Sequence, residues 1–306
     1  MLLAAGRGER LRPLTDVLAK PALPILDVPL GAWGAASLSG SPGFLVNVSH
    51  LADTVIEALD LESLGAQVLV ERPEPYGTGG TLAALRDRVD ERIVVWNADT
   101  LTDLDVDELW AAHKQIGLVG TIVVVPVPIG ADFRVGDGRA LELIDRRHAS
   151  EAGARYIGVA VFEKAALELL PTERPHGLTE TLLRSLIDRG ELGVHVHEGY
   201  ALDVGTIDRY LAASSDVLYE RAPQPPRSLL GKVVEVPGGR AYIGPGAQVG
   251  NASLGPGAII LANATVESRA RIENAIVWPG EHVAPETTVS NAVWFGGREL
   301  AARPHP

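Results

Sequence analysis

The stretch LLAAGRGERLRPLTDVLAKPALP, residues 2–24, decides how the whole chain is interpreted. It begins with a short apolar run that is typical of the end of a buried strand. Gly6 and Gly8 then open an arginine-rich loop, and Pro13 prevents a long helix from following at once. Lys20 adds a further cation. Glycines let backbone N–H groups approach an anion, and Arg and Lys side chains neutralise its charge, so the stretch predicts a polyphosphate site.

A Gly-rich turn with solvated arginines is the simpler alternative, and two better-known phosphate motifs do not fit. The dinucleotide fingerprint needs a third glycine with a helix directly after it, but Leu11 stands at that position and Pro13 follows. The Gly-Lys-Ser/Thr ending of a P-loop does not occur here.

Composition excludes several functional classes. The chain has 306 residues, enough for two domains with separate cores. Its formal net charge of −12 argues against a general nucleic-acid binder, which needs a basic face. The sequence contains no cysteine, which excludes disulfides, thiolate zinc sites and a cysteine nucleophile. It shows neither a signal-peptide pattern nor an apolar stretch of membrane-spanning length, so we expect a cytoplasmic enzyme without nucleic-acid or membrane partners.

Strand-like and helix-like segments alternate over about the first 215 residues. Apolar runs predict strands, and apolar residues at helical spacing predict helices between them. The alternation predicts an α/β fold with a doubly wound, mostly parallel sheet, which we assign to a catalytic domain at 1–220. Ligands in this architecture bind beyond the carboxyl ends of the strands, so the opening loop and residues 97–99 should reach one edge. The expected strands are 44–48, 67–70, 93–96 and 121–125, and the expected helices are 51–59, 78–89 and 105–115.

A different pattern follows the Pro-rich linker 221–231. Branched apolar residues recur there every five or six positions. A hexapeptide period is typical of a β-helix, in which each short strand turns one residue inward and stacks on the coil below. We therefore predict a β-helix domain at 232–306 with about three coils; a β-rich tail with chance periodicity is the alternative. The recurring residues are Ile243, Val249, Leu254, Ile260, Val266, Ile272, Val277, Val283 and Val289.

Four stretches, in order along the chain, resemble sugar-1-phosphate nucleotidylyltransferases. They are LAAGRGERLRPLT with AKPALPI at the start, GTGGTLAAL at 77–85, NAD at 97–99 and LDVGTIDRYLAA at 202–213. The GTGG run and the repeat tail are most similar to the mannose-1-phosphate guanylyltransferase branch, while GERLRPLT is also similar to the N-acetylmuramate-1-phosphate type, a uridylyltransferase. The resemblance implies a Rossmann-like nucleotidyltransferase domain, and the resemblance of the tail to hexapeptide-repeat proteins implies left-handed coiling.

The activity that this resemblance implies is transfer of a nucleotidyl group from a nucleoside triphosphate to a sugar 1-phosphate. A phosphate oxygen of the sugar phosphate attacks the α-phosphorus, and pyrophosphate leaves in line. The protein must bring two anions together and neutralise the developing charge. That requires cations and a divalent metal, usually Mg²⁺ held by one or two carboxylates and by phosphate oxygens.

Four charged residues match the family's catalytic groups. Arg10 and Lys20 match the basic residues that hold the triphosphate and the attacking phosphate. Asp99, after an apolar strand, matches the Mg²⁺ ligand, and Asp203 matches a carboxylate that binds the metal or the sugar phosphate. Turn residues are the alternative for both aspartates, with Thr206 as a cap for the following helix. The resemblance further assigns nucleotide contacts to Ala5, Gly6, Gly8, Gly77, Thr78 and Gly79, and sugar contacts to Gly158 and Glu180, although Glu180 also suits an exposed helix position.

Two other polar clusters have simpler explanations. Asp103, Asp105 and Asp107 resemble an Asp-x-Asp metal motif, but they also suit the acidic first turn of a helix. His195 and His197 alternate along a strand and share one face, without an evident third ligand.

Departures from the family pattern leave open whether catalysis is retained. Ala19 replaces the usual proline before the lysine, and the first strand is short. The family's Glu-Lys-Pro, whose lysine often contacts the sugar phosphate, is missing, with Arg146 or Arg147 as candidate substitutes. A regulatory subunit that binds nucleotide sugar without turnover is therefore the main alternative, and a hexapeptide acyltransferase is a third. We expect a homo-oligomer formed through the β-helix domain.

Overall fold

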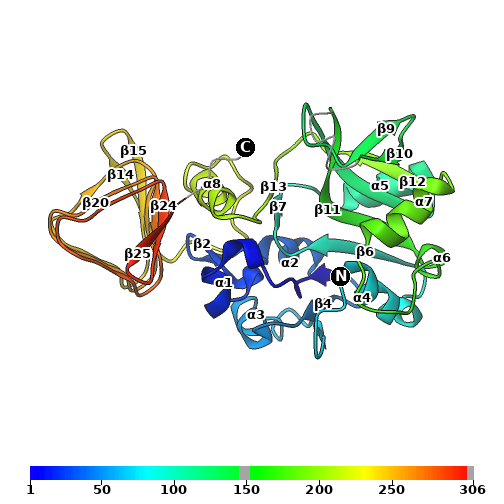
Figure 1. Cartoon of the computed structure of the whole chain (residues 1–306), viewed down its shortest axis with the longest axis horizontal. Helices are drawn as coiled ribbons and strands as arrows, with labels where there is room; N and C mark the ends of the chain where they lie inside the picture. The colour runs from blue at the N-terminus through cyan, green and yellow to red at the C-terminus, as the bar shows by residue number, and fades with distance from the viewer. Residues whose placement is uncertain (145–151, 302–306) are drawn as a thin grey trace. The chain divides into compact units, whose positions relative to one another are not determined.

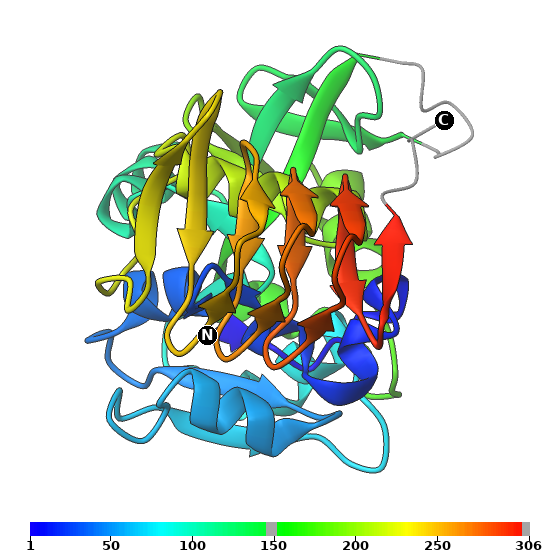
Figure 2. The same ribbon diagram turned by 90° about the vertical axis from the view of Figure 1, so that its left-hand side faces the viewer.

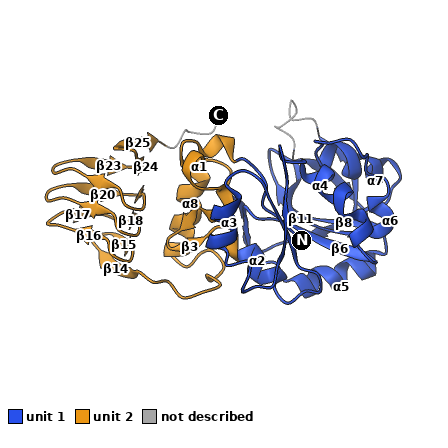
Figure 3. Ribbon diagram, turned by 90° about the horizontal axis from the view of Figure 1, so that it is seen from below, with its two compact units in different colours: residues 1–7, 33–203 blue, residues 8–32, 204–306 orange. Residues whose placement is uncertain are grey.

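The computed structural model describes residues 1–144 and 152–301, and the chain folds into two compact units (Figure 3). Unit 1 comprises Met1–Arg7 and Trp33–Asp203, and unit 2 comprises Gly8–Ala32 and Val204–Pro306. The arginine-rich segment therefore groups with the C-terminal part of the chain. A functional division at 1–220, 221–231 and 232–306 stays a prediction.

The centre of unit 1 is a sheet that, within the described residues, has nine strands (Figure 1). The strands follow one another in space as β5-β4-β1-β6-β11-β8-β12-β10-β9. They are β1 (Leu2–Leu3), β4 (Leu45–Val48), β5 (Gln67–Val70), β6 (Arg92–Asn97), β8 (Gly120–Val127), β9 (Phe133–Gly136), β10 (Arg139–Leu143), β11 (Gly153–Glu163) and β12 (Leu192–Val196).

Helices cover both faces of this sheet, as the alternation predicts. Leu3 and α4 residue Leu82 belong to one buried core. On the other face, Gly34 of α2 lies so close to Leu2 and Trp96 that a Cβ there would be 2.8 Å from Leu2 Cδ1. No helix in the described parts of the chain is both long and apolar enough to cross a membrane. The helices of unit 1 are α2 (Ala32–Leu38), α3 (Ala52–Ala58), α4 (Thr78–Leu85), α5 (Val106–Ile116), α6 (Lys164–Leu167) and α7 (Arg184–Asp188), with a π-helix, η5 (Thr179–Leu183), before α7 and a 3₁₀ turn, η3 (Arg86–Arg88), after α4.

The prediction of a mostly parallel sheet is wrong for the second half of the sheet, where parallel and antiparallel strands are mixed. β5, β4, β1 and β6 are parallel to one another, and β12 is parallel to β8. β11 instead runs antiparallel to both β6 and β8, and the hairpin β9–β10 is antiparallel as well. The chain between β8 and β11 contains this hairpin and no crossover helix among the described residues, and parallel pairing requires such a crossover.

The strand order places a topological switch at β1. The chain proceeds outward from β1 to β4 and β5, and then crosses back to β6 on the other side of β1. Leu3 therefore lies between Asn47 and Asn97 in register. In open α/β sheets, ligands bind beyond the carboxyl ends of the strands at such a point. In unit 1 this point lies after Leu3 and Asn97.

The C-terminal part of unit 2 is a three-sided coil of short parallel strands. Figure 1 looks along the coil, and Figure 2 shows one of its sheets face-on. On that sheet the stacked residues Tyr242, Ile259, Ile276 and Val293 lie 17 residues apart. Antiparallel hairpins at each end, β14–β15 and β24–β25, complete the sheet. Its strands are β14 (Lys232–Val236), β15 (Gly239–Ile243), β18 (Ala258–Ile260), β21 (Ala275–Val277), β24 (Ala292–Phe295) and β25 (Arg298–Ala301); the other two faces comprise β16 (Gln248–Val249), β19 (Thr265–Val266) and β22 (His282–Val283), and β17 (Ser253–Leu254), β20 (Arg271–Glu273) and β23 (Thr288–Ser290).

The recurring apolar residues face the inside of this coil. Ile260, Val266 and Ile272 are fully buried, and each stacks beneath the residue one coil later. Together with small residues such as Ala264 and Ala270 they form one core. The five- and six-residue spacing therefore identifies inward positions from Val249 onward, whereas Ile243 is half-buried and outside this core.

Residues 8–32 fold against this C-terminal part through a polar clasp at Asp27. Asp27 Oδ2 accepts hydrogen bonds from the backbone N–H groups of Leu230 (2.6 Å) and Gly231 (2.9 Å), and from the hydroxyl of Tyr242. Burial, followed by the contact with Asp27, raises the pKa of Tyr242, so its hydroxyl remains a donor. The other elements of unit 2 are η1 (Glu9–Leu11), α1 (Leu14–Val17), η2 (Lys20–Ala22), the hairpin β2 (Pro24–Ile25) and β3 (Val28–Pro29), and α8 (Ile207–Leu218).

The clasp predicts that Asp27→Ala destabilises the protein. Three donors would lose their common acceptor, and we expect a loss of about 1–3 kcal/mol. Urea unfolding followed by tryptophan fluorescence measures this. Tyr242→Phe, which removes only one of the three donors, is the matched control and should cost less; equal midpoints for Asp27→Ala and the parent would contradict the role of the clasp.

Candidate functional site

Asp99 and Asp203 come together at the carboxyl edge of unit 1. β6 ends at Asn97, and a turn at Ala98–Asp99 leads into β7 (Thr100–Thr102). β13 (Ala201–Asp203) pairs antiparallel with β7, and Asp203 stands directly opposite Thr100. Both aspartates are half-buried. Two aspartates about a hundred positions apart in sequence thus lie on neighbouring backbone segments.

Backbone and side-chain hydrogen bonds hold the turn that carries Asp99. The N–H of Ala98 donates to Leu3 O (2.9 Å), and the Thr100 hydroxyl donates to Ile157 O (2.8 Å). Gly158 follows, at φ +85°, in the irregular part of β11, where a Cβ would lie 2.5 Å from Asn97 Nδ2. Gly158 therefore lies at the same edge as the carboxylates, and the close contact with Asn97 requires a glycine there.

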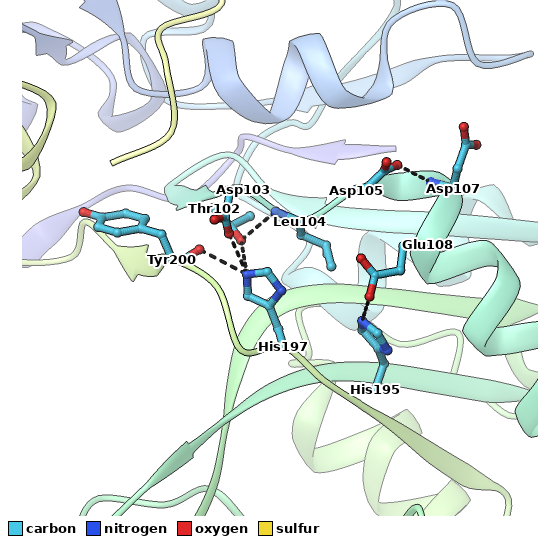
Figure 4. A network of polar contacts seen from close by, with 9 residues as sticks. All are labelled: Thr102, Asp103, Leu104, Asp105, Asp107, Glu108, His195, His197 and Tyr200. Atoms are coloured by element: carbon cyan, nitrogen blue, oxygen red, sulfur yellow. Dashed lines mark hydrogen bonds and ion pairs between the residues drawn. The ribbon is translucent and has the colours of Figure 1, made fainter. Parts of the chain in front are cut away.

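A polar network fastens β13 to β7 (Figure 4). His197 Nε2 lies 2.8 Å from Asp103 Oδ1 and 3.3 Å from both Thr102 Oγ1 and Tyr200 O. The N–H of Asp103 also donates to Tyr200 O (3.3 Å). The network closes the turn 198–200 that leads into β13, and so it supports the position of Asp203.

The aspartates before α5 and the neighbouring histidines form local structural contacts. Asp105 is the N-cap of α5 and accepts a hydrogen bond from Asp107 N (2.8 Å), as the acidic first turn predicts. Asp103 instead pairs with His197. His195 shares a face with His197, and its Nε2 lies 3.7 Å from Glu108 Oε1. Each histidine thus faces one acid.

The Gly-rich loop 77–80 packs against His176. The N–H groups of Gly79 and Gly80 donate to His176 O (3.1 and 3.2 Å). A Cβ on Gly77, which has φ +74°, would lie 2.3 Å from the same oxygen, and a Cβ on Gly79 would lie 2.5 Å from His176 Nδ1. Close packing therefore explains these two glycines by itself. Sequence reasoning missed His176, and the dense run of glycines is the signal that a backbone must approach there.

Thr78 and Glu180 lie where the Gly-rich loop 77–80 packs against the segment that begins at His176. The Thr78 hydroxyl accepts a hydrogen bond from Leu178 N (2.9 Å), although Thr78 itself is exposed. Glu180 is exposed in the first turn of η5, and its carboxylate folds back over Gly177. The predicted nucleotide loop and the predicted sugar residue Glu180 are thus neighbours in unit 1.

The loop after β1, which is predicted to bind phosphate, contributes residues to both units. In unit 1, Ala5 is buried, Gly6 is exposed and the adjacent Arg7 forms an ion pair with Glu74. Gly6 has open space where a Cβ would stand. Among the positions assigned to nucleotide binding, Gly6 is therefore one that a ligand can approach.

In unit 2, Gly8 shapes the rest of the loop. Gly8 has φ +64°, and a Cβ there would lie 2.9 Å from Thr15 Cγ2 and 3.1 Å from Lys20 Cβ. Its carbonyl accepts hydrogen bonds from Leu11 N and the Thr15 hydroxyl, both at 2.9 Å. These contacts bring Lys20 beside Gly8, and Arg10 is exposed in the same turn.

Three predictions about individual residues have different outcomes. Thr206 occupies the N-cap position of α8, but its hydroxyl makes no hydrogen bond to the helix, so the predicted side-chain cap is wrong. Arg146 and Arg147 lie outside the described residues. Assembly of Arg10 and Lys20 with Asp99 stays a prediction.

Comparison with known proteins finds a family model that matches the N-terminal part of the chain. Residues 1–136 match the family model described as nucleotidyl transferase. This part of the chain is therefore similar to nucleotidyl transferases. This match and the relatives below confirm the resemblance that the four motifs indicate.

Curated relatives of the nucleotidyl transferase domain are enzymes. The chain is 28% identical over 243 residues to a UTP–glucose-1-phosphate uridylyltransferase of Synechocystis, covering 71% of this chain and 63% of the relative. It is 25% identical over 314 residues to a mannose-1-phosphate guanylyltransferase of Mycobacterium tuberculosis, covering 99% of this chain and 81% of the relative. A zebrafish (Danio rerio) mannose-1-phosphate guanylyltransferase catalytic subunit beta is 26% identical, over 87% of this chain and 73% of its own.

A solved structure supports the mixed α/β fold. A putative glucose-1-phosphate thymidylyltransferase from Bacillus anthracis superposes with a TM-score of 0.61 at 20% identity, and the match covers 70% of this chain and 92% of that one.

The packing at His176 predicts that Gly77→Ala is strongly destabilising. A methyl group would meet the carbonyl of His176, which is backbone and cannot rotate away, so we expect a loss of about 2 kcal/mol or more. Gly65→Ala is the matched control, because Gly65 has φ +63° but open space around it. Urea unfolding compares the two variants, and equal losses would show that backbone strain alone is responsible.

The environment of His195 predicts that the folded protein loses stability as the pH falls. Burial lowers the pKa of His195, and the opposing effect of Glu108 is smaller. Above pH 6.5 the ring is neutral in both the folded and unfolded states, whereas below it the unfolded state binds the proton first. Stability should therefore fall as the pH decreases from 6.5 through the lower folded pKa. His195→Gln should lose less stability than the parent between pH 7.5 and pH 5, each measured against its own value at pH 7.5; identical pH profiles would refute this.

Proposed function

We propose that the chain transfers a nucleotidyl group from a nucleoside triphosphate to a sugar 1-phosphate, giving a nucleoside-diphosphate sugar and pyrophosphate. The observation that carries the proposal is the pairing of β7 with β13, which places Asp203 opposite Thr100, the residue that follows Asp99 at the carboxyl end of β6. This edge adjoins the β1 switch point, and Ala98 is hydrogen-bonded to Leu3 directly before the phosphate loop. The family domain and the named relatives support this class of reaction.

Asp99 and Asp203 are the residues that would hold Mg²⁺. Within residues 1–144 and 152–301, no three His, Cys, Asp or Glu side chains gather into a metal cluster. Two half-buried carboxylates without a protein cage suit Mg²⁺, which keeps waters and takes its remaining ligands from substrate phosphates. When bound, the ion neutralises charge on the reacting phosphates.

The loop that follows β1 neutralises the rest of the negative charge on the phosphates. Arg10 and Lys20 bind and orient the triphosphate, and Lys20 also holds the phosphate of the attacking sugar phosphate. Gly6 and Gly8 let the backbone approach the phosphates. The protein thus acts by positioning and charge neutralisation, and no side chain forms a covalent bond.

GTP with mannose 1-phosphate is the favoured substrate pair. The mycobacterial guanylyltransferase matches 99% of this chain, including the C-terminal coil. UTP with another sugar 1-phosphate is second, because the uridylyltransferase of Synechocystis is slightly more identical over a shorter stretch. Gly77, Thr78 and Gly79 contact the base, and Gly158 and Glu180 contact the sugar.

The coil of unit 2 is a left-handed β-helix of the hexapeptide-repeat type, and it joins copies of this chain into a homo-oligomer. Its inward branched residues and 17-residue stacking support the first assignment. Val233, which is 44% exposed on the edge strand β14, supports the second. We place the enzyme in the cytoplasm, where nucleoside triphosphates are available.

A pyrophosphate-release assay tests the proposed reaction. The purified chain with Mg²⁺ should release pyrophosphate from at least one pair in a matrix of triphosphates and sugar 1-phosphates. Asp99→Asn should lower kcat/KM at least about a hundredfold, because it removes one of two carboxylates near the reacting phosphates. Asp53→Asn, on the exposed side of α3, is the control and should keep parent activity.

The outcome that overturns the proposal is equally definite. Binding of a nucleoside-diphosphate sugar without turnover of any pair in the matrix would identify a regulatory subunit instead.

A further inference from the structure

A buried polar cluster lies in unit 1 between β4, the end of β5 and α4. It consists of Asn47, Glu71 and Thr81, whose exposed fractions are 3%, 1% and 1%. These residues come from three separate elements, and the proposed chemistry uses none of them. A buried carboxylate is costly unless its hydrogen bonds are satisfied, so the cluster requires an explanation.

Hydrogen bonds within the cluster use most of its polar atoms. Asn47 Nδ2 donates to Glu71 Oε1 (2.9 Å) and to Thr81 Oγ1 (3.2 Å). The single hydroxyl proton of Thr81 is directed to Glu71 Oε1 at 2.6 Å or to Gly77 O at 2.9 Å. Both amide protons of Asn47 are therefore used, and the donors that reach Oε1 are uncharged.

The cluster is also bonded to both loops that are predicted to contact the nucleotide. At one end, Ala4 N donates to Asn47 Oδ1 (2.9 Å), directly before Ala5 and Gly6. At the other end, Tyr76 N donates to Glu71 Oε2 (2.7 Å), directly before Gly77. One continuous path of hydrogen bonds thus runs from the loop after β1 to the loop before α4.

An apolar core at this place would fill the space equally well but would leave Ala4 N and Tyr76 N without partners. A carboxylate and an amide at fixed positions give each loop one defined hydrogen-bond acceptor. The two loops then have a fixed separation before any ligand arrives. Pre-organisation of this kind increases affinity by reducing the ordering cost of binding.

We propose that Asn47, Glu71 and Thr81 are positioning residues that set the affinity for the nucleoside triphosphate by fixing the separation of these two loops. The inference rests on the proposed function for the identity of the ligand. The three residues lie beneath the loops and touch neither substrate. Their loss should raise the KM for the triphosphate and leave the KM for the sugar 1-phosphate unchanged.

Substitutions at Thr81 and Glu71 test the proposal. Thr81→Val keeps the side-chain volume but removes the hydroxyl, whereas Thr81→Ser keeps the hydroxyl. Glu71→Gln replaces one acceptor oxygen by a donor, which opposes a donor that is already in place. We expect Thr81→Val and Glu71→Gln to raise the triphosphate KM about tenfold, as for loss of a charge-assisted hydrogen bond, and Thr81→Ser to restore it to within about twofold. Glu57→Gln, exposed on α3, is the matched control and should have the parent KM.

Calorimetric titration with GTP and UTP, in the presence of Mg²⁺, gives a second readout that does not need turnover. If the parent binds triphosphate but releases no pyrophosphate, the proposed function fails while the titrations still decide this inference. Weaker triphosphate binding by Thr81→Val, with rescue by Thr81→Ser, supports the positioning role even if Glu71→Gln fails to fold. Variants that lose stability but keep the parent's triphosphate affinity overturn it, and so does a parent that binds neither triphosphate.

Discussion

The pairing of β1 on both of its edges is the constraint on which unit 1 depends. Leu2 and Leu3 lie between β4 and β6 in parallel register, so three successive carboxyl ends fall on one line. Asn47 and Asn97 flank Leu3 there, and the chain beyond Leu3 must leave at this edge. A two-residue strand therefore determines where the predicted phosphate loop begins and where the turn that carries Asp99 leaves the sheet.

Local sequence patterns were sufficient for the elements around β1. The predicted strand 67–70 is β5, and the predicted helix 105–115 is α5 shifted by one residue, with Asp105 as its cap. These elements follow from apolar periodicity and from turn residues that lie close together in sequence. The same reasoning found the inward residues of the coil, since their period is itself local.

Pairings that join distant parts of the chain could not be predicted in this way. The sequence of residues 153–163 does not indicate that β11 runs antiparallel between β6 and β8, because the direction of a strand depends on the connection that precedes the strand. The contact of Gly77 with His176 joins residues about a hundred positions apart. Asp27 accepts three hydrogen bonds that tie residues 8–32 to the C-terminal coil, and no local pattern around it indicates these contacts. The candidate site was accordingly predicted by residue type and strand position, while its supporting contacts emerged only from the fold.

Burial separates two kinds of polar residue at the carboxyl edge of the sheet. Asp99 and Asp203 are half-buried on a turn and on a short outer strand, where a ligand can reach a carboxylate. Glu71 is almost fully buried, and its two oxygens accept from an amide, a hydroxyl and a backbone N–H. The same functional group is thus accessible to a ligand in one place and fully hydrogen-bonded within the protein in the other. Since a buried carboxyl group without these donors would be unstable, the hydrogen bonds that satisfy Glu71 also hold the loops that supply the donors.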